Sequence, residues 1–180
     1  MGATANDHAD LSGLCVLIVE DDFMAALYVA ESVEAMGGEV LGPVAATAEG
    51  IALVRRTQPH MAFLDMQLRD GFVTPLAAVL DQLDVPFALA TGYRGEELGK
   101  MVLSRAPRLS KPYRHADLIA MAAFLRQEVV GRRAYTIWER EGRPDGEADR
   151  HWWMAERELQ AIARAVPKKS FVRQSEQVGL

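Results

Sequence analysis

The chain has 180 residues, of which 49% are hydrophobic and 25% are charged, and its formal net charge is −5. This length allows one full domain with its own core plus an appendage, and the composition is ordinary for a globular protein. The negative charge disfavours a general nucleic-acid binder, and no apolar run approaches the length that spans a bilayer. Cys15 is the single cysteine, so an intrachain disulfide is excluded. We therefore expect a soluble, cytoplasmic protein that binds neither DNA nor a membrane.

Short apolar runs alternate with amphipathic stretches along most of the chain. The apolar runs predict five strands, at residues 14–19, 39–45, 60–65, 85–91 and 108–110, of which the one at 39–45 is the weaker. Apolar residues at helical spacing predict helices between them, at residues 23–38, 48–57, 73–83 and 115–130. Such alternation is typical of a parallel sheet covered by helices on both faces. The sequence therefore predicts an α/β fold, a doubly wound five-stranded parallel sheet of the flavodoxin-like type.

Local signals mark the ends of several predicted elements. Glycine 37 and its neighbour end the first helix, and Asp22 is suited to cap its N-terminus. Thr47 is a suitable N-cap for the second helix. Pro43 cannot donate a ladder hydrogen bond, so the strand at residues 39–45 is expected near an edge of the sheet.

The pattern changes after Gly131. Two helices are predicted there, joined by the turn GRPDG, and together they form a helical hairpin. The second helix carries an apolar stripe of Trp152, Ala155, Leu159, Ile162 and Val166. Two short helices bury too little by themselves, so we expect the hairpin to dock on the preceding domain, on a second copy or on a partner. The predicted organisation is a flexible N-terminus (1–12), the α/β domain (13–130), the hairpin (131–166) and a disordered tail (167–180).

Chemically capable residues stand where the predicted strands end. Glu20 and Asp21 follow the first strand, Asp65 ends the third, Thr91 ends the fourth and Lys111 follows the fifth. Ligands of open parallel sheets bind outside the carboxyl ends of the strands, so these side chains are expected to share one cleft. Three carboxylates require a cation, and a small set of hard oxygen ligands suits Mg²⁺ completed by water and phosphate. A nearby lysine and hydroxyl would then bind the oxygens of a phosphoryl group.

This constellation resembles the receiver domain of bacterial two-component response regulators, over residues 14 to about 127. The matching stretches are VLIVEDD, FLD, ATG and KP, in the order of that family. The stretch VPFALATGY is similar to the single-domain subgroup that carries Phe-Ala-Thr-Gly-Tyr, with Leu89 where that subgroup has phenylalanine. Farther along, IWEREGRPDG and HWWMAERELQ resemble a short bacterial helical module of uncharacterised role.

The resemblance implies a role for each residue of the phosphoryl site. Asp65 would be the nucleophile that accepts a phosphoryl group from a kinase phosphohistidine. Thr91 would hydrogen-bond that group, and Lys111 would neutralise its charge. Pro112 would follow a cis peptide bond that orients the lysine. Because phosphoryl transfer depends mainly on positioning and charge neutralisation, these groups would be sufficient.

The resemblance also implies a Mg²⁺ site beside the acceptor. Asp21 would bind the ion directly, and Glu20 would bind it through water. The backbone carbonyl of Gln67 would complete the protein's share of the ligands, together with Asp65.

Two positions depart from the receiver pattern. Arg108 stands where receivers carry an aromatic residue that turns inward on phosphorylation. Tyr93, or a reordering of the helix near it, is a candidate replacement for that switch. In the stretch GYRGEELGK (92–100), Gly95 and Gly99 each cost a helix about 1 kcal/mol relative to alanine, so we expect the helix there to be mobile without phosphate.

The leading hypothesis is a phospho-accepting response regulator whose partners are a sensor histidine kinase or phosphotransfer protein and an unknown output protein. It would phosphorylate and slowly dephosphorylate itself without being an enzyme in any wider sense. One alternative is a Mg²⁺-dependent phosphohydrolase with Asp65 as nucleophile, which Gln67 disfavours because such enzymes use a second acid there. Another is an unphosphorylated receiver-like scaffold, which the departure at Arg108 keeps open. The apolar stripe of residues 115–130 permits a homodimer.

Overall fold

The computed structural model describes residues 9–92 and 101–165, and its centre is a five-stranded parallel sheet. The strand order is β2-β1-β3-β6-β7, which is the flavodoxin-like order predicted from the sequence. The expected edge position of the strand that contains Pro43 is confirmed, because β2 is the first strand of the sheet. The strands are β1 (Cys15–Val19), β2 (Glu39–Val44), β3 (Met61–Asp65), β6 (Phe87–Thr91) and β7 (Arg108–Ser110).

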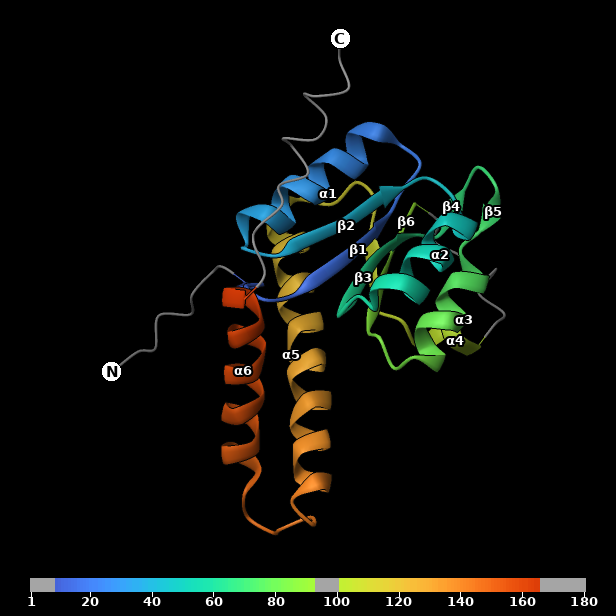
Figure 1. Ribbon diagram of the computed structural model, residues 1–180. Coiled ribbons are helices and arrows are strands. Elements are labelled where there is room, and N and C mark those ends of the chain that lie inside the picture. Colours follow the sequence, from blue (N-terminus) through green and yellow to red (C-terminus); the bar gives the residue numbers. More distant parts are fainter. Residues whose placement is uncertain (1–8, 93–100, 166–180) are drawn as a thin grey trace.

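Helices cover both faces of this sheet (Figure 1). They are α1 (Phe23–Ala35), α2 (Thr47–Thr57), α3 (Thr74–Gln82), α4 (Met101–Arg105), α5 (His115–Arg140) and α6 (Ala148–Ala165). One core joins α1, α5 and α6 to the sheet, and a second core joins α2, α3 and α4 to its other face. Each buried strand therefore supplies side chains to two cores, which explains why β1 and β3 are almost continuously apolar. Within residues 9–92 and 101–165, no helix has the combination of length and apolarity that crossing a bilayer requires.

The loop after Asp65 contains a small antiparallel hairpin that the sequence did not predict. Its strands are β4 (Gln67–Leu68) and β5 (Gly71–Phe72). At its turn, Asp70 accepts a hydrogen bond from the backbone N–H of Thr47 at 2.9 Å. The prediction that Thr47 caps α2 was therefore wrong: Thr47 is the first helical residue, and the carboxylate of Asp70 satisfies the free N–H instead.

The helix expected at residues 115–130 continues without interruption to Arg140. The boundary predicted between residues 130 and 131 therefore lies inside α5, and the C-terminal hairpin consists of the second half of α5 and all of α6 (Figure 1). Ala155 and Leu159 of α6 belong to the same core as Leu11 and Leu125. The part of the stripe formed by Ala155 and Leu159 is thus covered by the protein itself.

The apolar stripe at the start of α5 is also used within the chain. Leu118 and Ala122 are fully buried, and only 1% of the surface of Leu125 is exposed. These three side chains are therefore used within the chain, and the homodimer that the sequence permitted stays a prediction. Phe124, on another face of α5, is half exposed.

Cys15 at the start of β1 provides a first prediction. Its thiol donates a hydrogen bond to Glu39, and burial together with that bond raises the pKa of Cys15 from 9.0 to about 12. The thiolate, which is the reactive species, is therefore scarce in the folded protein. We expect iodoacetamide at pH 8 to label native protein about a hundred- to a thousandfold more slowly than urea-unfolded protein. Mass spectrometry of timed samples measures both rates, and equal rates would contradict the burial of this thiol.

Candidate functional site

Side chains from the ends of several strands meet at one edge of the sheet. Glu20 and Asp21 follow β1, and Asp65 is the last residue of β3. One carboxylate oxygen of each of these three residues lies within 4.8 Å of the other two. Lys111 follows β7, and Thr91 ends β6. All five side chains that the sequence singled out at strand ends therefore lie at this edge, because parallel strands end on the same side.

Lys111 joins two of the three carboxylates. Its ammonium Nζ lies 2.6 Å from Glu20 Oε2 and 2.7 Å from Asp65 Oδ2. Burial alone would lower the pKa of Lys111, but the hydrogen bonds to Asp65 and Glu20 outweigh it and the pKa is raised. Lys111 therefore stays charged and fixes the distance between the acid of β1 and the acid of β3.

Glu20 is the most buried of the three acids, with 5% of its surface exposed. Desolvation raises the pKa of Glu20, although the ammonium of Lys111 opposes this effect. The backbone of Asp22 donates a hydrogen bond to Glu20 Oε1 at 3.3 Å. Asp22 itself accepts a bond from the backbone N–H of Ala25 at 2.8 Å, so its expected role as the N-cap of α1 is confirmed.

A bulge in β2 determines where Glu20 lies. The register between β1 and β2 shifts between Leu17 and Val19, opposite Gly42. Gly42 has a φ of +95°, and a Cβ there would lie 2.9 Å from the carbonyl oxygen of Ile18. Beyond the bulge, the backbone N–H of Glu20 donates to the carbonyl of Val44 at 3.0 Å. The position of the buried acid therefore depends on a glycine that the sequence analysis did not single out.

Asp21 has a cationic neighbour that the sequence analysis missed. Arg69 Nε lies 3.4 Å from Asp21 Oδ2, and Arg69 Nη2 donates to the backbone carbonyl of Asp21 at 3.4 Å. Arg69 is at the turn of the β4–β5 hairpin, four residues after Asp65. A cation so close in sequence to the expected acceptor was the available signal, but the contact itself spans 48 residues.

Asp65 lines a pocket of about 200 Å³ together with Met66, Gln67, Thr91, Gly92 and Lys111. Asp65 Oδ1 accepts a hydrogen bond from the backbone N–H of Gln67 at 3.2 Å. Thr91 is almost fully buried, and its backbone carbonyl accepts a bond from the N–H of Lys111 at 2.8 Å. The peptide bond between Lys111 and Pro112 is cis, as the resemblance implied. The pocket thus has a carboxylate, a hydroxyl and an ammonium on its wall.

The donor set fits a divalent cation of the hard type. Three carboxylate oxygens converge at one point, which is costly unless positive charge compensates them. Within the described residues, Lys111 compensates Glu20 and Asp65, and Arg69 compensates Asp21. Asp21 and Asp65 remain partly accessible, with side-chain exposures of 18% and 14%, so an ion can reach both.

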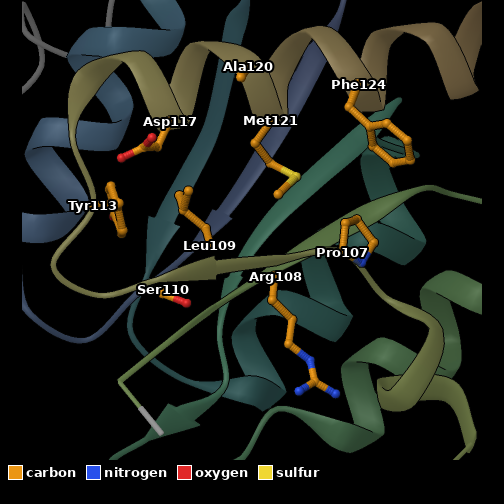
Figure 2. Close-up of a pocket in the computed structure, with 9 residues that line it drawn as sticks. All are labelled: Pro107, Arg108, Leu109, Ser110, Tyr113, Asp117, Ala120, Met121 and Phe124. Carbon is orange, nitrogen blue, oxygen red and sulfur yellow. The ribbon is translucent and has the colours of Figure 1, made fainter. Parts of the chain in front are cut away.

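The two expected switch positions have different outcomes. Tyr93 lies outside the described residues, as do residues 93–100 whose mobility was predicted. Arg108 is exposed on β7, where a pocket of about 550 Å³ lies between this strand and α5. Figure 2 shows the guanidinium of Arg108 pointing away from α5, whereas Met121 and Phe124 point from α5 toward the pocket.

Tyr113, two residues after Lys111, lines the same pocket and was not identified from the sequence. Its ring lies 6.3 Å from that of Tyr28. Burial raises the pKa of Tyr113, so the phenol stays protonated at neutral pH. Tyr113 thus places an aromatic side chain on the wall of the pocket between β7 and α5, whereas the receiver pattern has an aromatic residue at position 108.

The described histidines, His60, His115 and His151, contact other residues of the fold. His60 Nδ1 accepts a hydrogen bond from the backbone N–H of Cys15 at 2.9 Å. His151 is 2% exposed, and its Nε2 lies 3.0 Å from Glu141 Oε2 near the turn of the α5–α6 hairpin. The ring of His115 packs against Tyr28.

Comparison with known proteins agrees with this fold. A family model described as "Protein of unknown function (DUF2934)" matches residues 125–161, within the α5–α6 hairpin. A search among proteins with curated descriptions gives no significant match. Among solved structures, the chain is similar to the response regulator PhyR from Brucella abortus, with 23% identity and a TM-score of 0.60 over 72% of this chain and 54% of that one.

Two shorter structures are similar as well. SdrG from Sphingomonas melonis has 29% identity and a TM-score of 0.53, over 63% of this chain and 98% of that one. The signal receiver domain of a modulated diguanylate cyclase from Desulfovibrio desulfuricans has 25% identity and a TM-score of 0.53, over 63% of this chain and 96% of that one. The chain spans about half the length of the PhyR structures it matches. The predicted receiver resemblance and fold are therefore confirmed.

Proposed function

We propose, from the premise that this chain has a receiver fold, that it is a phospho-accepting response regulator that is modified on Asp65. The observation that carries the proposal is the joint contact of Lys111 with Glu20 and Asp65, at 2.6 and 2.7 Å. An ordinary ion pair on a protein surface joins one cation to one acid, and it does not require two acids from different strands around the same lysine. A site that must hold a phosphoryl group beside a cation does need it.

Asp65 is the nucleophile in this proposal. One of its carboxylate oxygens forms a bond to phosphorus, and the bond from phosphorus to the donor's leaving group breaks. The leaving group is a histidine nitrogen of a sensor kinase or phosphotransfer protein, or the acetate of acetyl phosphate. The backbone N–H of Gln67 orients the carboxylate by donating to Oδ1 at 3.2 Å. Thr91 and Lys111 line the space that the phosphoryl oxygens enter.

The residues that would hold Mg²⁺ are Asp21, Asp65 and the carbonyl of Gln67, with Glu20 bound through water. When bound, the ion supplies positive charge to the phosphoryl oxygens and thereby favours transfer. Lys111 supplies a second positive charge beside Asp65 Oδ2, at 2.7 Å. Glu20 keeps that ammonium in place, because the pair is partly buried and joined by a short hydrogen bond.

The alternatives from the sequence are less well supported. A phosphohydrolase of this type needs an acid two residues after its nucleophile, and Gln67 there has no carboxylate. A scaffold without phosphorylation has no use for a lysine held between two acids at the mouth of a pocket. We therefore assign the output to protein–protein contact or to relay of the phosphoryl group.

Incubation with Mg²⁺ and acetyl phosphate tests the proposal. Intact mass spectrometry should show uptake of one phosphoryl group by the wild type and none by Asp65→Asn. Asp81→Asn, which removes an exposed carboxylate on α3, is the matched control and should behave as the wild type. Unchanged uptake by Asp65→Asn, or repeated turnover of phosphate esters, would refute the assignment.

A further inference from the structure

Arg69 lies beside the three carboxylates of Glu20, Asp21 and Asp65, which we call the acidic edge. The position of its backbone is fixed. It is at the turn of the β4–β5 hairpin, next to Asp70. Asp70 accepts hydrogen bonds from the backbone N–H and the hydroxyl of Thr47, at 2.9 and 3.4 Å, which fasten the hairpin to the start of α2. The backbone that carries Arg69 is therefore held by a buried threonine.

The side chain of Arg69 is held much less firmly than its backbone. Its two contacts with Asp21 are both 3.4 Å, and 84% of the side chain is exposed. By contrast, Lys111 has contacts of 2.6 and 2.7 Å and is 27% exposed. A long, exposed ion pair is worth little in free energy, so Arg69 can leave Asp21 at small cost.

The charges at this edge explain what Arg69 adds. Counted as ionised, the three carboxylates exceed the two cations Lys111 and Arg69 by one negative charge. Binding of a divalent cation makes the edge positive by one charge, and an incoming phosphoryl donor is an anion. Without Arg69, the same edge would be more negative before the cation binds and only neutral afterwards. Arg69 therefore opposes the cation and favours the anion.

We propose that Arg69 is the exchangeable counterion of Asp21, which lowers the affinity of the acidic edge for Mg²⁺ and attracts the anionic phosphoryl donor once the ion is bound. This inference rests on the proposed function for its second half only. Arg69 is a positioning and specificity-determining residue in this role. It competes for Asp21 by its charge, and after release its guanidinium remains at the mouth of the site because Asp70 holds the hairpin.

Titration with Mg²⁺ alone, followed by calorimetry, tests the first half. Arg69→Gln should bind Mg²⁺ about two- to fivefold more tightly than the wild type at low salt. The difference should shrink at high salt, because exposed charges are screened. Arg56→Gln changes the net charge equally at the other end of α2 and should leave the affinity unchanged. In an Asp21→Asn background, Arg69→Gln should have a smaller effect, because the competition for Asp21 is gone and only the repulsion between the guanidinium and the ion remains. An unchanged or weaker affinity in Arg69→Gln, or no Mg²⁺ binding by either protein, would overturn the inference.

Acetyl phosphate at saturating Mg²⁺ tests the second half. Arg69→Gln should take up phosphoryl groups about two- to fivefold more slowly than the wild type. The variant would then bind Mg²⁺ more tightly and accept phosphoryl groups more slowly. A purely structural role of Arg69 would not give these opposite signs. If the wild type accepts no phosphoryl group but Arg69→Gln still binds Mg²⁺ more tightly, the proposed function fails and the counterion role stands. Equal uptake rates in both proteins would overturn the donor role.

Discussion

Lys111→Met is expected to slow phosphoryl uptake from acetyl phosphate by about two orders of magnitude, because an oriented charge is lost from the acceptor. The substitution also leaves Glu20 and Asp65 facing each other without the ammonium that joins them at 2.6 and 2.7 Å. Glu20 is buried, so the loss of its partner should lower the free energy of unfolding by about 1–3 kcal/mol. Adding Mg²⁺ should restore part of that stability, since the acids then have a cation again.

Lys111→Arg is the informative control for this prediction. It keeps the charge, so most of the stability should remain, but a planar guanidinium cannot take the place of a compact ammonium between two carboxylates. Uptake should therefore fall in both variants, whereas stability should fall mainly in Lys111→Met. Intact mass and urea denaturation measure the two quantities. Wild-type uptake by Lys111→Met would remove the main support for the proposed site.

Gly42→Ala should have the largest effect on stability among the glycine variants. A Cβ there would lie 2.9 Å from both the carbonyl oxygen of Ile18 and the N–H nitrogen of Val44, which are backbone atoms that cannot turn aside. The φ of +95° adds strain for any residue other than glycine. We expect a loss of at least about 3 kcal/mol, together with displacement of Glu20.

Gly146→Ala is the matched control for Gly42→Ala. Gly146 has a φ of +79°, but an added Cβ would meet no atom within 4 Å. It should therefore show only the conformational cost, about 1–2 kcal/mol. The difference between the two midpoints of urea denaturation isolates the clash with β1. Equal losses would mean that β2 can move away from β1, and that Glu20 does not depend on the bulge.

The two cations at this site, Lys111 and Arg69, differ in how firmly they are held. Both cations neutralise acids, but Lys111 is fixed by short contacts and Arg69 is exposed. In the proposed function, the fixed charge of Lys111 would stabilise the transferred group, whereas the exchangeable charge of Arg69 would adjust the affinity for the ion. On this proposal, the loop after Asp65 would act through the side chain of Arg69 as well as through the backbone of Gln67.

The sequence by itself determined the order of strands and helices and the set of residues at the strand ends. Periodicity is a local property, and parallel strands must end at one edge, so Glu20, Asp65 and Lys111 could be brought together without coordinates. Asp22 was identified as a cap for the same reason, since it bonds a backbone group three residues away. These inferences need only neighbouring residues and a general rule of sheet topology.

The tertiary structure alone decided which cations hold which acids and how the C-terminal hairpin is attached. The contact of Arg69 with Asp21 spans 48 residues, and that of Asp70 with Thr47 spans 23. Neither contact leaves a periodic signal in the sequence, because an exposed arginine or aspartate has the same local sequence pattern with or without such a contact. The continuity of α5 through Gly131 was likewise hidden, since glycine weakens a helix locally while packing against α6 sustains it. Long-range pairing and packing override local preference, and they become visible only when the chain is folded.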